Sequence, residues 1–150
     1  MTVPDCMTIQ GWREFCRSHE LEGSRILFET SDEEIKAFCN GIGSEAMPKW
    51  SREFLDRLHP SMRIAAAIHD LEYALLEDRS DQSFRECNAR FQRNCATVVK
   101  VLYGWYDPRR YFAIYKSKQF AAVLDLCGKP AWKKARKDYL KREKKSKRLD

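Results

Sequence analysis

The sequence predicts an all-α protein, and three observations support that fold class. Apolar side chains recur at steps of three and four residues over most of the 150-residue chain, which is the spacing of one helix face. A capping box, Ser31-Asp-Glu-Glu34, marks the start of one such run. No run keeps up the apolar–polar alternation of a strand for long. We therefore expect essentially no sheet.

The N-terminal third of the chain should hold short helices. The first carries an apolar stripe from residue 9 onward and stops near Gly23, and a second spans residues 31–39. A further apolar segment over residues 50–58 ends at His59-Pro60, because the residue before a proline disfavours the helical conformation.

Two long helices joined by a polar turn form the centre of the predicted fold. The first starts near Ser61 and carries apolar residues at 64, 68, 71 and 75. The second starts near Ser80, and its stripe from Asp81 to Leu102 is the longest in the chain, with Asn88 in its middle. A third helix over roughly 109–127 ends at Gly128.

Positive charge is concentrated at the C-terminal end. The chain has a net charge of +6, whereas residues 129–150 alone hold 11 Lys and Arg against 3 Asp and Glu. We therefore expect one domain over residues 1–128 and a basic helical tail over 129–150. Trp132 and Tyr139 among the lysines favour an anionic membrane surface as the partner of this tail, with the nucleic-acid backbone as the alternative.

Aromatic residues follow the second long helix. Trp105, Tyr106, Tyr111 and Phe112 are expected in the core, with a belt at a membrane interface as the alternative. No stretch approaches the roughly 18 apolar residues of a membrane span, so no transmembrane segment is expected.

Cysteine usage and the N-terminus bear on the compartment. The six cysteines show no CxxC pair, which favours free thiols, with one or two disulfides open if the protein is released. The first residues lack the basic flank and apolar block of a signal peptide. The expectation is a protein that is cytoplasmic as synthesised, with release by a non-classical route left open.

The strongest chemical signal is His69-Asp70-Leu71-Glu72-Tyr73, preceded by the turn Cys39-Asn40-Gly41-Ile42-Gly43-Ser44. His69 and Tyr73 share one helix face, and Asp70 is turned away by about 100°. An imidazole suits the deprotonation of water, and a carboxylate suits calcium, which also accepts backbone carbonyls. The two glycines allow backbone conformations that are closed to other residues, so the carbonyls of Cys39, Gly41 and Gly43 could converge on one ion.

Together these motifs resemble the phospholipase A2 superfamily, in particular its small bacterial and viral members, over roughly residues 38–102. The resemblance implies calcium-dependent hydrolysis of a phospholipid ester, with His69 as the general base. It implies calcium held by Asp70 and by the carbonyls of Cys39, Gly41 and Gly43. It also implies that Tyr73 braces a carboxylate on the following helix, which in turn orients His69.

The helical hairpin indicates which residue takes the place of that carboxylate. Residues equidistant from the turn near 78–79 face each other, and this puts Asn88 opposite His69. Asp81, roughly 10 Å further along the helix, is the second candidate. The family pattern has aspartate where we place Asn88. An amide oxygen can orient the imidazole, but it cannot stabilise the imidazolium by charge, so a weakened activity is expected.

An alternative hypothesis is a catalytically inactive module on the same scaffold. It would bind a membrane, nucleic acid or a protein through residues 129–150. Asn88 motivates it, as does Ala66, which stands where related members often have a cysteine that pairs with the glycine loop. Asn88 could then be a buried amide with a purely structural role. The sequence thus leaves open whether the protein is an enzyme.

Overall fold

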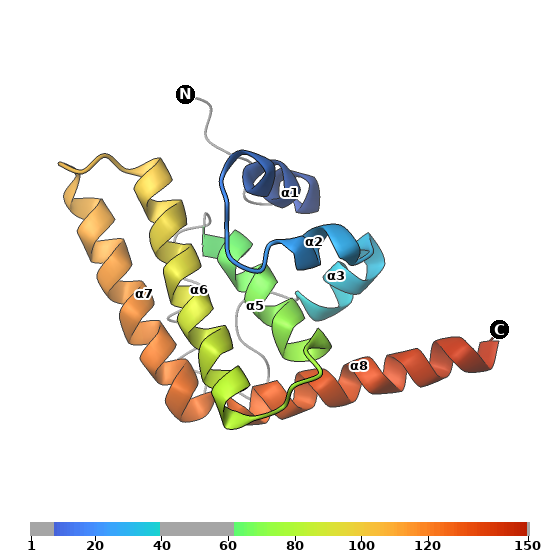
Figure 1. Ribbon diagram of the computed structural model, residues 1–150. Helices are drawn as coiled ribbons and strands as arrows, with labels where there is room; N and C mark the ends of the chain where they lie inside the picture. Colours follow the sequence, from blue (N-terminus) through green and yellow to red (C-terminus); the bar gives the residue numbers. More distant parts are fainter. Residues whose placement is uncertain (1–7, 40–61, 150) are drawn as a thin grey trace.

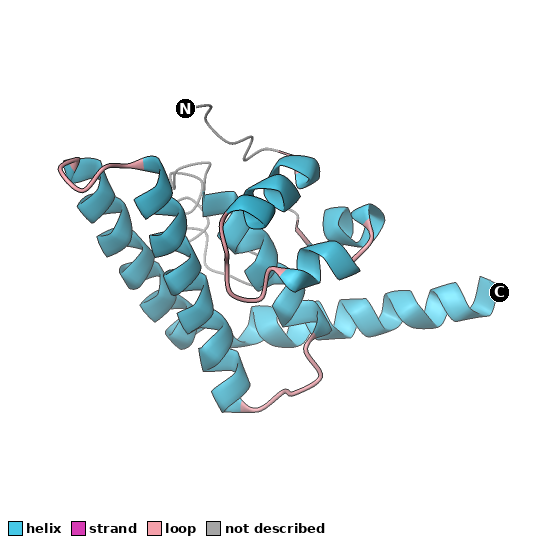
Figure 2. Cartoon of the chain, turned by 45° about the horizontal axis from the view of Figure 1, so that its top comes forward, coloured by secondary structure: helices cyan, strands magenta, loops and turns pink. Residues whose placement is uncertain are grey.

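The computed structural model describes residues 8–39 and 62–149, which hold seven helices and no strand (Figures 1 and 2). The predicted all-α class is therefore confirmed. The glycine turn at 40–44 and the apolar segment at 50–58 lie outside the described residues.

Three short helices form the N-terminal part: α1 (Ile9–Ser18), α2 (Arg25–Glu29) and α3 (Asp32–Phe38). The N-cap half of the capping box predicted at Ser31 is present, since the Ser31 hydroxyl accepts from the Glu34 amide at 3.3 Å. The sequence analysis missed α2, which is only 5 residues long. The apolar faces of these helices pack against the middle of the chain through a shared set of buried residues: Trp12, Phe15, Leu27, Ile35, Ile64, Ile68 and Leu71.

Four longer helices follow: α5 (Arg63–Leu75), α6 (Asp81–Leu102), α7 (Pro108–Cys127) and α8 (Lys129–Leu149). Helix α6 runs antiparallel to both α5 and α7 (Figure 1). Side-chain caps fix the starts of α6 and α7, where Ser80 accepts from the Ser83 amide at 3.1 Å and Asp107 from the Arg109 amide at 3.0 Å. The predicted helical hairpin is confirmed.

Helix α8 begins inside the core. Ala131 and Trp132 are buried, and Arg136 donates to the carbonyl of Ala74 on α5 at 3.1 Å. The later turns extend away from α6 and α7 (Figures 1 and 2), and α3 lies across a hollow from them. Trp132 is thus unavailable to a membrane, and the exposed basic tail is shorter than residues 129–150. The expectation of an interfacial Trp132 was wrong because the chain turns back onto α5 directly after Gly128.

The aromatic residues near the α6–α7 turn are exposed, contrary to the prediction that they lie in the core. The relative exposure is 74% for Trp105 and 77% for Tyr106, and Tyr111, Phe112 and Tyr115 are also exposed. Only α6 and α7 meet at this end of the hairpin in the described part of the chain (Figure 1), so the aromatic side chains find nothing to pack under.

The cysteines that the structure describes are free thiols, as expected: Cys16, Cys39, Cys87, Cys95 and Cys127. Cys87 and Cys95 are buried, and Cys95 lies in the apolar core as a small side chain. Within the described ranges, no helix is both long and apolar enough to cross a bilayer.

Candidate functional site

His69 and Asn88 form the centre of a buried polar cluster. Nε2 of His69 lies 2.9 Å from Oδ1 of Asn88, and both side chains are buried, Asn88 completely. The pairing expected from equal distances to the α5–α6 turn is confirmed. The ring of Phe91, 5.3 Å from that of His69, closes the apolar wall around the imidazole.

Tyr73 binds the same amide oxygen. Its hydroxyl donates to Oδ1 of Asn88 at 2.6 Å, and its ring lies 4.1 Å from the His69 ring. Burial is the main reason that the pKa of Tyr73 is raised, so the hydroxyl remains a donor at every ordinary pH. The expected position of Tyr73 beside the His69 partner is confirmed, although that partner is an amide.

Asp125 of α7 is the third neighbour of Asn88, and the sequence analysis did not single it out. Nδ2 of Asn88 donates to Oδ1 of Asp125 at 2.8 Å. A carboxylate only accepts hydrogen bonds, so the amide nitrogen must face Asp125 and the oxygen must face His69. The same equal-distance argument, applied to the turn at 103–107, would have placed the last turns of α7 opposite Asn88.

This arrangement determines the tautomer of His69. Because the amide oxygen accepts from the ring, Nε2 carries the hydrogen when the ring is neutral. Nδ1 then keeps its lone pair, and it points toward the Asp70 side of the helix, 3.8 Å from Oδ1 of Asp70. A neutral imidazole with an unprotonated Nδ1 is the form that a general base requires.

Asp70, the expected calcium ligand, is partly buried on α5, and this burial raises the pKa of its carboxyl. Burial is also the larger cause of the raised pKa of the Cys39 thiol, and the negative charge of Asp70 adds to it. The Cys39 thiol donates to the carbonyl of Ala67 at 3.6 Å. The end of α3, where the glycine turn departs, therefore lies against α5 near Asp70.

The expected ligand set is only partly described. Gly41 and Gly43 lie outside the described residues, so the structure places Asp70 and Cys39 alone. Over residues 8–39 and 62–149, no group of three or more His, Cys, Asp or Glu side chains gathers in a metal-binding arrangement. A cation at Asp70 would need backbone carbonyls or water as its other ligands.

Asp81, the second candidate for the partner of His69, lies elsewhere. Its carboxylate pairs with the ammonium group of Lys129 at the start of α8, and its side chain is 78% exposed. The first turn of α6 faces α8, whereas Asn88, two turns later, faces α5 and α7. The structure thus brings Asn88 to His69, and it does not place Asp81 there.

Arg79, which sequence reasoning also missed, holds the end of α5 in place. Its guanidinium donates to the carbonyl of Tyr73 at 2.9 Å and to that of Trp132 at 2.6 Å, and it lies 3.5 Å from the centre of the Trp132 ring. A basic residue just after a helix is a signal for such a cap. Arg79 therefore fixes the turn of helix that carries Tyr73.

Glu72, inside the motif, has a structural environment. It is buried, and it pairs with Arg90 of α6 and accepts from the Cys87 thiol at 3.7 Å. Burial raises the pKa of Glu72, and the charge of Arg90 offsets only part of that effect. The pair ties α5 to α6 beside the His69 cluster.

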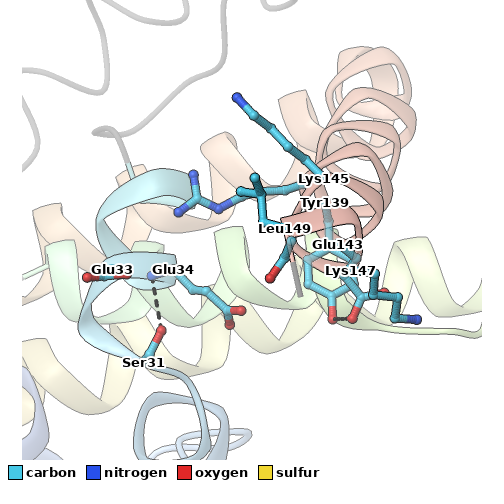
Figure 3. Close-up of a pocket in the computed structure, with 10 residues that line it drawn as sticks. Ser31, Glu33, Glu34, Tyr139, Glu143, Lys145, Lys147 and Leu149 are labelled. Carbon is cyan, nitrogen blue, oxygen red and sulfur yellow. Dashed lines mark hydrogen bonds between the residues drawn. The ribbon is translucent and has the colours of Figure 1, made fainter.

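A separate hollow lies between α3 and the outer turns of α8 (Figure 3). Ser31 and Glu34 line one side, and Tyr139, Glu143 and Lys145 line the other. None of the residues around His69 contributes to it. The hollow is therefore a separate surface feature, with both acidic and basic side chains in its walls.

Comparisons with known proteins do not assign the chain. No protein-family model, no curated protein and no solved structure matches it. Any function therefore has to be argued from the geometry around His69.

Proposed function

We propose that this chain is a calcium-dependent, phospholipase A2-like hydrolase of a phospholipid ester. The observation that carries the proposal is the fixed imidazole. His69 is held through Nε2 by Asn88, and its Nδ1 faces the carboxyl group of Asp70 at 3.8 Å. The resemblance of residues 38–102 to that superfamily supplies the reaction class.

In this proposal His69 moves the proton. Nδ1 takes a proton from the attacking water and returns it to the alcohol that leaves the ester. Asn88 and Tyr73 keep the ring in the plane that this transfer needs. The Asn88 amide carries no charge to stabilise the imidazolium. The loss in rate relative to a carboxylate is at most about 10⁴-fold, the cost of an Asp-to-Asn change in a serine protease triad.

Asp70 has the chemistry of a calcium ligand. In the described part of the chain its only ion-pair partner is His69, at 3.8 Å, so a partly buried carboxylate is left with little compensation. Calcium held there, with carbonyls of the turn that starts at Cys39, would supply positive charge beside the ester carbonyl. Of the expected ligands, the described part of the chain supplies the carboxylate of Asp70 and the carbonyl of Cys39.

The test is release of fatty acid from mixed phospholipid vesicles by the purified chain at millimolar calcium. We expect the wild-type chain to release fatty acid, and we expect no release after addition of a chelator or by the Asp70→Asn variant. The matched control is Asp78→Asn, since Asp78 is an exposed carboxylate of the α5–α6 turn that accepts from Ser80 and lies outside the His69 cluster. No release by the wild-type chain, or equal release by Asp70→Asn, would rule the proposal out.

The second candidate function is a non-catalytic module that binds anionic lipid, nucleic acid or a protein through the exposed part of α8. It is favoured by the amide at position 88 and by the basic turns that project from the core (Figure 1). Deleting residues 129–150 would also remove the buried Trp132, so charge reversal of Lys144, Lys145 and Lys147 is the cleaner test. Absence of calcium heat in calorimetry, with binding lost on charge reversal, would favour the module.

A further inference from the structure

We infer that Asp125 is a positioning residue of this site, which sets the orientation of the Asn88 amide and, through it, the tautomer of His69. The consequence for rate rests on the proposed function, whereas the consequence for the tautomer does not. The contacts run from Asp125 to Nδ2 of Asn88 at 2.8 Å and from Oδ1 of Asn88 to His69 at 2.9 Å.

An amide at position 88 has two orientations, and of its three hydrogen-bond partners in the described part of the chain only Asp125 separates them. Tyr73 can donate or accept, and each nitrogen of the neutral imidazole can do either, so both could adapt to a reversed amide. Asp125 cannot adapt, because reversal would bring the amide oxygen to its carboxylate at hydrogen-bond distance. Without Asp125, the reversed amide would donate to Nε2 and drive the hydrogen to Nδ1, which removes the base.

Asp125 acts from the protein surface. Asn88 is fully buried, whereas Asp125 is exposed on α7 and reaches the amide with one oxygen. The charge therefore stays hydrated and escapes most of the cost of burying an ion. A carboxylate at position 88 would bear that cost in full.

The contact also predicts how a return to aspartate at position 88 behaves. In Asn88→Asp two carboxylates would meet at the place where a 2.8 Å hydrogen bond now lies, which is unfavourable. The double variant Asn88→Asp/Asp125→Asn reverses the polarity of that bond and keeps it. We expect the double variant, and not the single one, to exceed the wild-type rate.

The decisive experiment is nuclear magnetic resonance of the ¹⁵N-labelled imidazole at a pH that keeps the ring neutral. We expect the Nε2–H tautomer in the wild type, a shift toward Nδ1–H in Asp125→Asn, and the Nε2–H form again in the double variant. Asp81→Asn is the matched control, because it removes another exposed carboxylate of this hairpin that pairs with Lys129 instead. Circular dichroism establishes that each variant is folded.

A second readout is hydrolysis. Asp125→Asn should lower kcat by about 10–100-fold, the range for removing a group that orients a functional residue, with KM nearly unchanged. Asparagine at position 125 can still accept from Nδ2 of Asn88 through its own amide oxygen, so Asp125→Ala is measured as well. An unchanged tautomer in Asp125→Ala would overturn the inference. If the wild type hydrolyses no lipid, the proposed function fails, while the tautomer measurement still decides the role of Asp125.

A different observation carries a second proposal. Five exposed aromatic residues gather at the α6–α7 turn and the start of α7, and we call them the aromatic surface: Trp105, Tyr106, Tyr111, Phe112 and Tyr115. Basic side chains surround them. Lys118 is exposed, and the ammonium group of Lys116 lies 5.0 Å from the Phe112 ring centre. Arg109 is also exposed, and it pairs with Asp107 at 2.7 Å.

We propose that the aromatic surface docks on an anionic phospholipid bilayer. Amphipathic aromatic rings lie favourably at the level of the headgroups, and neighbouring cations attract anionic lipids. A second copy of the same surface would bring like charges together. The rings of Trp105 and Tyr106 stand at 85° to each other, so they do not offer the parallel faces on which successive bases of a nucleic acid stack.

Vesicle sedimentation tests this proposal without the reaction. The vesicles are made of ether-linked phosphatidylglycerol, which has no acyl ester to cleave. A chelator is present, so calcium cannot bridge the protein to the lipid. We expect the triple variant Trp105→Ala/Tyr106→Ala/Phe112→Ala to partition at least tenfold less than the wild type. Leu126→Ala is the control, since Leu126 is an apolar side chain with 84% exposure near the other end of α7.

Three outcomes would overturn the second proposal. One is equal partitioning by the triple variant and the wild type. Another is binding of a single-stranded oligonucleotide that depends on the aromatic surface, with no binding to vesicles. The last is a concentration-dependent dimer in sedimentation velocity that the triple variant abolishes, with no binding to vesicles.

Discussion

The two ends of the α6–α7 hairpin carry similar side chains in opposite environments. We call the end where α5 stops and α8 starts the closed end. There the ring of Trp132 lies 5.1 Å from the ring of Tyr73 and 5.8 Å from that of Phe84, and all three side chains are buried. At the other end, the aromatic surface is exposed. The difference is one additional layer, because α8 and Arg79 cover the closed end, whereas among the described helices only α6 and α7 meet at the other.

The candidate site belongs to the closed end. Tyr73 contacts both the Trp132 ring and the Asn88 amide, so the aromatic packing also sets the position of the polar cluster. The aromatic surface does not support the polar cluster, and its exposed rings can contact a partner. Stability should therefore depend on the closed end, and contact with a partner on the aromatic surface.

Replacement of one tryptophan at each end gives the largest expected contrast. Trp132→Ala should lower the free energy of unfolding by about 3–5 kcal/mol, because it empties a packed aromatic site. Trp105→Ala should change it by less than about 0.5 kcal/mol, because the side chain is exposed. Urea unfolding measures both, and equal losses would show that the two ends do not differ.

Alanine at the two turn glycines gives a smaller contrast. A Cβ on Gly128 would lie 2.5 Å from the Leu124 carbonyl oxygen and 3.0 Å from the Tyr73 hydroxyl, so backbone must shift. We expect Gly128→Ala to cost about 1–3 kcal/mol, as overpacking does. A Cβ on Gly104 would meet only the ring of the exposed Tyr106, at 2.7 Å, and that ring can rotate away.

Thermal unfolding measures the pair of glycine variants. Gly104→Ala should leave Tm nearly unchanged, and Gly128→Ala should lower it. A Gly104→Ala variant that is the less stable of the two would contradict the assignment of tight packing to the closed end.

Asp70→Asn gives a smaller expected effect on stability than Trp132→Ala or Gly128→Ala. Burial raises the pKa of Asp70, so the folded chain holds a proton there at pH values where the unfolded chain has lost it. The contribution of Asp70 to stability is therefore present below about pH 3.9 and is lost as the pH rises through the folded pKa. In chelator at neutral pH, Asp70→Asn should raise Tm by a few degrees.

The calcium arm of that experiment separates structure from function. Calcium should raise the Tm of the wild type by mass action and leave the Asp70→Asn variant unchanged. A variant that is less stable than the wild type in chelator would show that the carboxylate has a stabilising partner, and the reason for placing a cation there would disappear.

The sequence predicted what depends on spacing along one helix or across one short turn. The N-cap at Ser31, the helical hairpin and the pairing of His69 with Asn88 are all of this kind. Asp125 was missed because its contact depends on a third helix. Trp132 and Trp105 were assigned to opposite environments from those observed, because composition does not tell which end of a hairpin a later helix covers.

The central claim is that His69 is a base and not a buried polar residue of the core. The most direct test is the initial rate of fatty-acid release from phospholipid vesicles in calcium by His69→Ala, with His19→Ala as the control, since His19 ends α1 outside the polar cluster. We expect His69→Ala to fall to the background rate while remaining folded, and His19→Ala to match the wild type. Release by His69→Ala at the wild-type rate would contradict the claim.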